Sequence, residues 1–164
     1  MTKTSAPDAM GASHTGRRQV LRVALGAGAA AVLAGLPNAA LATTAELSAA
    51  IATFTAGAAA KPGRVTLDVA PLVENGNSVP ITVSVQSPMT AADHVTAIAV
   101  FNQSNPQRDV AVFRLGPRAG RAVVATRIRL ATSQQLLAVA QLSDGTFWSG
   151  AVDVIVTLAA CVES

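Results

Sequence analysis

Residues 65–85 read VTLDVAPLVENGNSVPITVSV, and this stretch decides the fold. Apolar and polar residues alternate strictly over residues 65–69 and again over residues 81–85, which is the period-two pattern of half-buried β-strands. Between them, Glu74-Asn75-Gly76-Asn77 is rich in residues that favour tight turns. We therefore expect two antiparallel strands with residues 74–77 as the turn between them.

Further β-type runs follow along the chain, and turn signals separate them. The runs cover residues 95–101, 110–115, 121–130, 135–142 and 151–158. The turn signals include Asn105-Pro106, residues 116–120 and Ser143-Asp144-Gly145. About seven short antiparallel strands are typical of a two-sheet sandwich, although the cysteine pair of antibody domains is missing. The predicted fold class is mainly β, an immunoglobulin-like antiparallel β-sandwich over residues 61–158 with a short N-terminal helix.

The helix is expected just before the sandwich. Leu47, Ile51 and Phe54 recur at the i, i+4, i+7 spacing of one apolar helix face. Gly57 and then Lys61-Pro62-Gly63 interrupt this pattern. The sequence predicts a helix over about residues 44–56, within an N-terminal segment of residues 43–60.

Residues 1–42 have the pattern of an export signal. Arg17 and Arg18 stand directly before a weakly hydrophobic, alanine-rich run, and Ala40-Leu41-Ala42 forms a small-residue cleavage site. The run between Arg22 and Pro37 is shorter than the roughly 20 residues that cross a bilayer, so stable membrane insertion is not expected. We predict a twin-arginine signal peptide, cleavage after Ala42 and a periplasmic location.

The charge of the chain is concentrated in this predicted signal. The full sequence carries a formal net charge of +3, but the part after Ala42 has eight basic and eight acidic side chains. It also has one tryptophan and no tyrosine, so it offers neither a basic stripe nor stacking platforms for bases. Nucleic acid is therefore not an expected partner.

Cys161 is the only cysteine of the chain, so it has no partner for an internal disulfide. It follows the last predicted strand, in a tail of residues 159–164. The small side chains of Ala159 and Ala160 keep the tail slender beside the thiol. An accessible thiol at the tip of a tail suits a carrier of covalent cargo. The alternative is that Cys161 ends a strand and packs as a small apolar residue. The residues alone leave both interpretations open.

No other constellation predicts catalysis or metal binding. His94 is the single histidine after Ala42, and with Cys161 it supplies too few ligands for an ordinary metal site. Arg127 and Arg129 fall on one face of a predicted strand, with Ile128 and Leu130 on the other. This pattern is typical of a solvated outer face, and a patch that attracts anions or a partner is the second interpretation.

Several motifs in series resemble the SoxY family, in order and in spacing, over residues 65–161. They are Glu74-Asn75-Gly76-Asn77-Ser78-Val79-Pro80, Ser87-Pro88-Met89-Thr90, Asn105-Pro106, Phe113-Arg114-Leu115-Gly116-Pro117-Arg118-Ala119-Gly120, Thr126-Arg127-Ile128-Arg129-Leu130 and Asp144-Gly145-Thr146-Phe147-Trp148.

The resemblance implies a carrier for thiosulfate oxidation, not an enzyme. It implies a heterodimer with a SoxZ-like subunit and sulfur intermediates bound covalently to Cys161. SoxAX would couple thiosulfate to the thiol, SoxB would release sulfate and the SoxCD sulfur dehydrogenase would oxidise the remaining sulfur. No catalytic residue and no cofactor of the chain's own are implied.

The tail departs from the family pattern. The family typically has Gly-Gly-Cys-Gly-Gly, whereas this chain has Ala159-Ala160-Cys161-Val162-Glu163-Ser164. Alanine restricts the backbone more than glycine, and the β-branched Val162 restricts it further. Two alternatives therefore stand beside the thiosulfate carrier: a SoxY-like carrier of another cargo, and a periplasmic interaction or assembly module with an inert or intermolecularly bonded cysteine.

Overall fold

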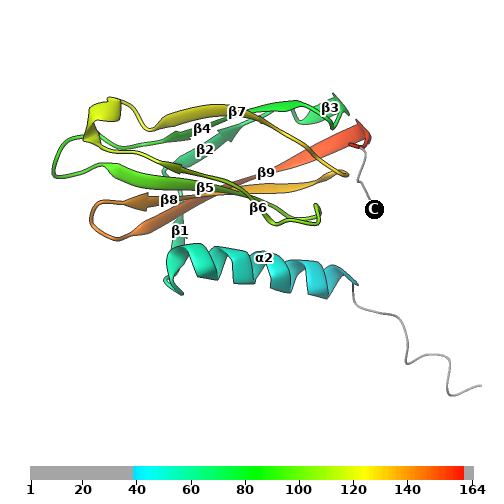
Figure 1. The fold of residues 1–164 in the computed structure, drawn as a ribbon, viewed down its shortest axis with the longest axis horizontal. Coiled ribbons are helices and arrows are strands. Elements are labelled where there is room, and N and C mark those ends of the chain that lie inside the picture. The colour runs from blue at the N-terminus through cyan, green and yellow to red at the C-terminus, as the bar shows by residue number, and fades with distance from the viewer. Residues whose placement is uncertain (1–38, 161–164) are drawn as a thin grey trace, which may run out of the picture. The chain divides into compact units, whose positions relative to one another are not determined.

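The computed structural model describes residues 39–160. In this range one helix, α2 (Ala39–Thr55), precedes nine strands and a short 3₁₀ helix, η1 (Pro117–Ala119) (Figure 1). The predicted twin-arginine pair Arg17 and Arg18 lies outside the described residues.

The strands form two sheets that pack face to face. The larger sheet has the order β1 (Ala60–Pro62), β9 (Phe147–Leu158), β8 (Gln134–Leu142), β5 (Val95–Asn102) and β6 (Asp109–Arg114), and β3 (Leu72–Asn75) also pairs with β9. The smaller sheet has the order β2 (Val65–Asp68), β4 (Val79–Val85) and β7 (Val123–Ile128). The mainly β sandwich predicted from the sequence is confirmed.

The expected antiparallel pairing of residues 65–69 with 81–85 is confirmed, since Leu67 lies opposite Val83 in the β2–β4 ladder. The connection between these strands is not the single turn that was predicted. Between them the chain crosses to the larger sheet as β3, which runs parallel to β9. Strand β3 has two adjacent apolar residues, of which Leu72 is exposed and Val73 is buried, so its sequence does not show the alternation that reveals a strand.

A second correction concerns β1, which also pairs in parallel with β9, with Lys61 opposite Trp148. The sandwich is therefore mixed and not wholly antiparallel. The sequence analysis interpreted Lys61-Pro62-Gly63 as an interruption between the helix and the first strand. An edge strand tolerates proline, since only one of its sides is needed for the ladder.

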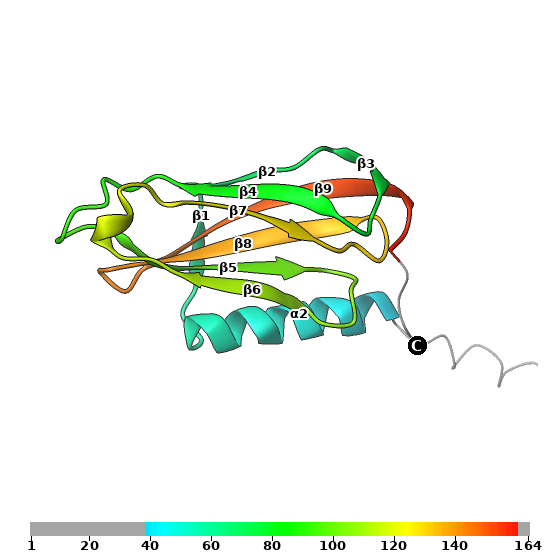
Figure 2. The same cartoon turned by 45° about the horizontal axis from the view of Figure 1, so that its top comes forward.

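The core has two parts because β5 is buried on both faces. Ile98 and Val100 point into the space between the sheets, where most buried apolar residues gather. Ala99 and Phe101 point to the opposite face, which α2 covers. The molecule thus has three layers: α2, the larger sheet and the smaller sheet (Figure 2).

Helix α2 uses the predicted apolar face. Leu47, Ile51 and Phe54 pack on the larger sheet, and the ring of Phe54 lies edge-on to Phe101, with 6.2 Å between ring centroids. The helix begins at Ala39, earlier than predicted, so it spans the predicted cleavage site, and it ends at Thr55. No helix in residues 39–160 is long and apolar enough to cross a membrane.

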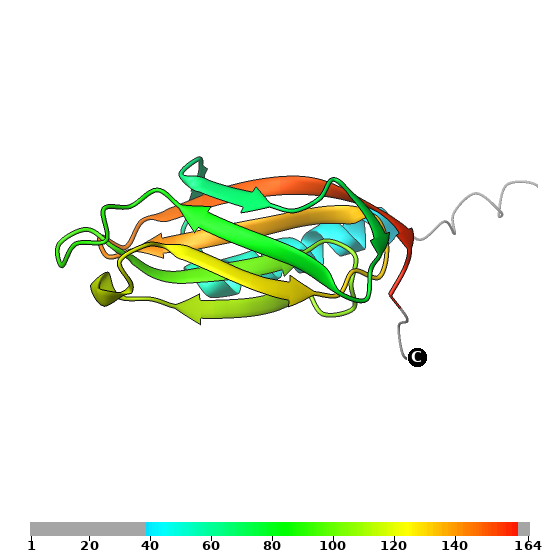
Figure 3. The same ribbon diagram turned by 90° about the horizontal axis from the view of Figure 1, so that it is seen from above.

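The direction of the strands brings a set of loops to one end of the sandwich, here called the tail end. It comprises residues 76–78, 103–108 and 129–133 and the end of β9 (Figures 1 and 3). The connections over residues 86–94, 115–122 and 143–146 lie at the opposite end. The segment that leads to Cys161 therefore leaves the domain among the loops of the tail end.

Candidate functional site at the tail end

The sequence predicted a tail that starts at Ala159, directly after the last strand, but in the structure the chain is held against the sandwich as far as Ala160. Strand β9 ends at Leu158, as expected, and Ala159 is exposed. Ala160, however, is only 5% exposed. Cys161 and Val162 lie outside the described residues, so Ala160 is the last residue whose contacts are known before the thiol.

Three backbone hydrogen bonds hold the chain at this point, and we call them the clasp. The N–H of Gly76 donates to the carbonyl of Leu158 at 2.8 Å, and the N–H of Leu130 donates to the carbonyl of Gly76 at 2.8 Å. The N–H of Ala160 then donates to the carbonyl of Leu130 at 3.0 Å. The β3–β4 turn, the β7–β8 loop and the end of β9 are thereby joined around one residue, Gly76.

Gly76 has no room for a side chain. A Cβ atom there would lie 2.3 Å from the carbonyl oxygen of Leu130 and 2.9 Å from the nitrogen of Ala160. Both distances are far below van der Waals contact, and both neighbours are backbone atoms. Glycine at this position is therefore a packing requirement of the clasp.

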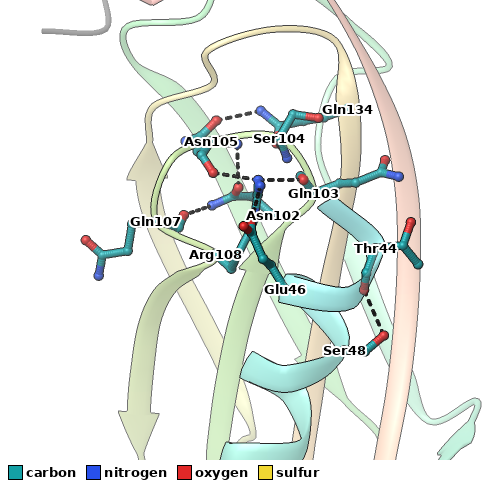
Figure 4. A network of polar contacts seen from close by, with 10 residues as sticks. All are labelled: Thr44, Glu46, Ser48, Asn102, Gln103, Ser104, Asn105, Gln107, Arg108 and Gln134. Carbon is teal, nitrogen blue, oxygen red and sulfur yellow. Dashed lines mark hydrogen bonds and ion pairs between the residues drawn. The ribbon is translucent and has the colours of Figure 1, made fainter. Parts of the chain in front are cut away.

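The side chain of Asn105 in the β5–β6 loop holds the β7–β8 side of the clasp, and Figure 4 shows its contact with Gln134. Its Oδ1 accepts hydrogen bonds from the N–H of Ala131 at 3.0 Å and from Nε2 of Gln134 at 2.7 Å. Its Nδ2 donates to the carbonyl of Arg129 at 2.8 Å. Asn105 thus fixes the backbone on both sides of Leu130, the residue that accepts from Ala160.

The loop that carries Asn105 is itself closed by side chains. The N–H of Asn105 donates to Oδ1 of Asn102 at 2.8 Å, and Nδ2 of Asn102 donates to the carbonyl of Gln107 at 2.7 Å. Arg108 Nη1 donates to the carbonyls of Gln103 and Asn105, each at 2.6 Å. A polar loop with its backbone groups satisfied in this way is well ordered.

Arg108 also connects this loop to the start of the helix. Its Nη2 lies 2.7 Å from Oε2 of Glu46 in α2, and its side chain is 12% exposed, against 60% for Glu46 (Figure 4). The guanidinium therefore bridges α2 and the β5–β6 loop from a largely buried position.

Arg127 lies on β7 as predicted, whereas Arg129 follows the end of this strand at Ile128 and belongs to the β7–β8 loop. Both are exposed, whereas Ile128 is 5% exposed and Leu130 is fully buried. Arg127 Nη1 contacts Oγ of Ser78 at 3.4 Å. Arg129 borders a hollow of about 360 Å³ that Asn105 and neighbouring loop residues also line. The solvated outer face is confirmed, and a role for either arginine in anion or partner contact stays a prediction.

Within residues 39–160, no three His, Asp or Glu side chains come close enough together to hold a metal ion. His94 lies at the opposite end of the sandwich, beside the β8–β9 turn, where its N–H donates to Oγ of Ser143. Its buried Nδ1 has no hydrogen-bond partner among the described residues.

Sequence reasoning missed the clasp and the role of Asn105. The Asn105-Pro106 pair was visible only as a turn signal, because a side chain that bonds a loop far along the chain leaves no periodic pattern. Asn75-Gly76 correctly indicated a turn, but the turn signal did not reveal that the glycine is also needed for close backbone approach.

Comparison with known proteins gives the family of the chain. Residues 51–161 match the family model described as sulfur oxidation protein SoxY, a range that reaches Cys161. No curated protein sequence matches the chain.

Among solved structures, the sulfur carrier protein SoxY from Chlorobium limicola f thiosulfatophilum superposes with a TM-score of 0.59 at 28% identity, covering 70% of this chain and 99% of that one. A superoxide reductase (neelaredoxin) from Ignicoccus hospitalis superposes with a TM-score of 0.51 at 17% identity, covering 57% of this chain and 80% of that one. The second match shows a shared sandwich fold only.

The family model covers most of the sandwich, the clasp and the cysteine that follows it. This chain therefore belongs to the SoxY family of sulfur oxidation proteins.

Proposed function

We propose that this chain is a periplasmic carrier that holds thiosulfate-derived sulfur covalently on Cys161 and presents it to partner Sox enzymes. The observation that carries the proposal is the position of Cys161, which is the next residue after the clasp at the tail end. The family match and the likeness to a SoxY sulfur carrier support it.

The chemistry requires only one accessible thiolate from this chain. In the first step the Cys161 sulfur forms a bond to the outer sulfur of thiosulfate, and a partner oxidase accepts two electrons. The product is an S-thiosulfonate. Water then attacks the sulfonate sulfur, sulfate leaves with release of two protons, and a persulfide remains on Cys161. Thiolate attack and sulfur–sulfur bond exchange are ordinary chemistry of accessible cysteines.

Export by the twin-arginine route and assembly with a SoxZ-like subunit complete the proposal. The surface is consistent with a partner, since Leu72 and Ile155 are opposite each other in the β3–β9 ladder and are 56% and 59% exposed. Transient contact with SoxAX, SoxB and SoxCD would follow at the tail end. Size-exclusion chromatography of the chain produced alone tests the assembly: a stable, soluble monomer would argue against a required partner.

Intact-mass spectrometry of the periplasmic protein from thiosulfate-fed cells tests the carrier role. We expect sulfur additions that reductant removes, that map to Cys161 and that are absent in Cys161→Ser. Cys161→Ser is a matched control because it replaces one atom at the tail. A free unmodified thiol, or only a disulfide to a second protein, would instead favour the interaction or assembly module.

A further inference from the structure

The tail end contains a chain of contacts that runs from the β5–β6 loop to the last described residue before Cys161. Asn105 holds the backbone of Arg129 and Ala131, and the carbonyl of Leu130 between them accepts from Ala160. Each of these contacts is 2.8–3.0 Å long. None of these residues carries the proposed chemistry, and the contacts end at Ala160, the residue that precedes Cys161.

We propose that Gly76 and Asn105 are positioning residues that fix the origin of the carrier tail at Ala160. This inference rests on the proposed function for its consequence, but the geometry can be tested without it. The length of tail that can reach a partner is then counted from Ala160 and not from Leu158, where β9 ends. Cys161 is the first residue beyond the origin.

The two positioning residues act on different sides of the clasp. Gly76 lets the β3–β4 turn come close enough to bond both Leu130 and Leu158, because it has no Cβ. Asn105 holds the β7–β8 loop in place, so that the carbonyl of Leu130 points at Ala160. Loss of either residue should release Ala160 while the strands remain paired.

A fixed origin matters to a carrier because ordering a loose segment at the moment of binding lowers affinity. With Ala160 held, only the residues after it must be ordered when the thiol enters a partner's active site. A fixed origin also shortens the distance that the thiol can extend from the sandwich, because each residue adds at most about 3.6 Å to an extended chain. A partner enzyme must therefore approach the loops of the tail end closely.

The test uses two samples of the full chain. Amide hydrogen exchange of Ala160 is measured by NMR on the unlabelled chain, and a nitroxide spin label is placed on Cys161, the single cysteine, in a second sample for electron paramagnetic resonance. In Asn105→Ala and in Gly76→Ala we expect exchange at Ala160 to rise at least tenfold and the nitroxide spectrum to narrow. Asn105→Asp keeps the acceptor for Ala131 but turns a second acceptor toward the carbonyl of Arg129, so exchange at Ala160 should rise in this variant as well.

Leu142→Ala is the matched control. Leu142 is 2% exposed in the same core but lies at the opposite end of the sandwich, so its loss destabilises the fold without touching the clasp. At comparable loss of stability, exchange at Ala160 and the spectrum should stay as in the parent chain. An Asn105→Ala chain with unchanged exchange at Ala160, or a control that shifts equally, would overturn the proposal even if Gly76→Ala failed to fold.

A functional measurement follows from the same variants. Coupling of thiosulfate to Cys161 by the partner oxidase should lose at least threefold in kcat/KM for Asn105→Ala, with Leu142→Ala unchanged. If no adduct forms on any chain while exchange at Ala160 still responds to Asn105→Ala, the carrier function fails and the positioning role stands. If adducts form but exchange does not respond, the positioning role fails alone.

Discussion

The N–H of Ala160 donates to the carbonyl oxygen of Leu130 at 3.0 Å, and this bond joins the last residue before the cysteine to the β7–β8 loop. Ala160 is also 5% exposed, so the chain is held against the sandwich up to this residue. In a chain whose tail has alanines where the family typically has glycines, the root of the tail is a structured element.

Replacement of Ala160 by proline tests this bond directly. Proline has no N–H, so Ala160→Pro leaves the buried carbonyl of Leu130 without this donor, and the free energy of unfolding should fall by about 1–3 kcal/mol. Ala160→Gly keeps the donor and should cost less than Ala160→Pro. Denaturant unfolding measures both. Equal stability of the proline and glycine variants would show that the bond contributes nothing.

Gly150 in β9 should be intolerant of a side chain because the two sheets approach each other closely there. A Cβ atom at Gly150 would lie 2.2 Å from the carbonyl oxygen of Val65 in β2. We expect Gly150→Ala to lower the free energy of unfolding by about 1–3 kcal/mol, as overpacked sites do. Gly116→Ala is the control, since its added Cβ meets no atom within 4 Å and its φ is −151°. A thermal-unfolding comparison in which both variants match the parent chain would contradict the prediction.

Phe54 anchors α2 to the larger sheet. Its ring lies edge-on to Phe101 and to Phe147, with centroid separations of 6.2 and 5.9 Å. Phe54→Ala should cost about 3–5 kcal/mol at most, less if the half-buried site relaxes, and should raise amide exchange along α2. Exchange in the smaller sheet, which α2 does not cover, should change less. Uniform loss of protection throughout the molecule would show that α2 is not a separately docked layer.

Arg108 and Glu46 form one ion pair but should contribute unequally to stability. Glu46 is 60% exposed, so its removal loses a solvent-screened pair, and Glu46→Ala should cost at most about 1 kcal/mol. Arg108→Ala also leaves the carbonyls of Gln103 and Asn105 without their donor and should cost about 2–3 kcal/mol. Urea unfolding with and without added salt separates the ion pair from the hydrogen bonds to the two carbonyls. Only the loss of stability that comes from the ion pair, which both variants share, should become smaller in salt.

The stability of the folded chain should depend on pH through Asp144 in the β8–β9 turn. Hydrogen bonds from the N–H of Thr146 and from its Oγ1, at 2.9 and 2.7 Å, hold the pKa of the Asp144 carboxyl below its ordinary value of 3.8, and the nearby charge of Arg64 acts in the same direction. The ionised form is favoured in the folded state. Its stabilisation is therefore complete above pH 3.8 and is lost as pH falls through the lower folded pKa.

Asp144→Asn should remove this contribution. The variant should be less stable than the parent chain at pH 6, and the difference should shrink as pH falls below 4, in unfolding curves recorded at constant ionic strength. A difference that stays constant over this range would mean that ionisation of Asp144 is not linked to folding.

The predicted elements show which structural signals are local. Strand β4 and the apolar face of α2 were visible, because burial of one face imposes a period on the sequence. Strand β5 is buried on both faces and was visible as a continuous apolar run. Strands β1 and β3 were not, since neither has an alternating buried face and each is held mainly by β9. The predicted site shows the same division: Cys161 was evident as the single thiol, and Asn105 was not, because its partners are 24–29 residues away.

The sequence by itself determined the sandwich, the docking face of α2, the exposed side of Arg127 and Arg129, and the thiol on which the proposed chemistry depends. These features depend on residue type and on spacing within one segment. Only the tertiary structure decided that β1 and β3 run parallel to β9, that Gly76 is needed for close backbone approach, and that the tail is held as far as Ala160. Those features depend on backbone groups from distant segments meeting at one end of the molecule, and a backbone carbonyl or N–H has no signature in the amino-acid sequence.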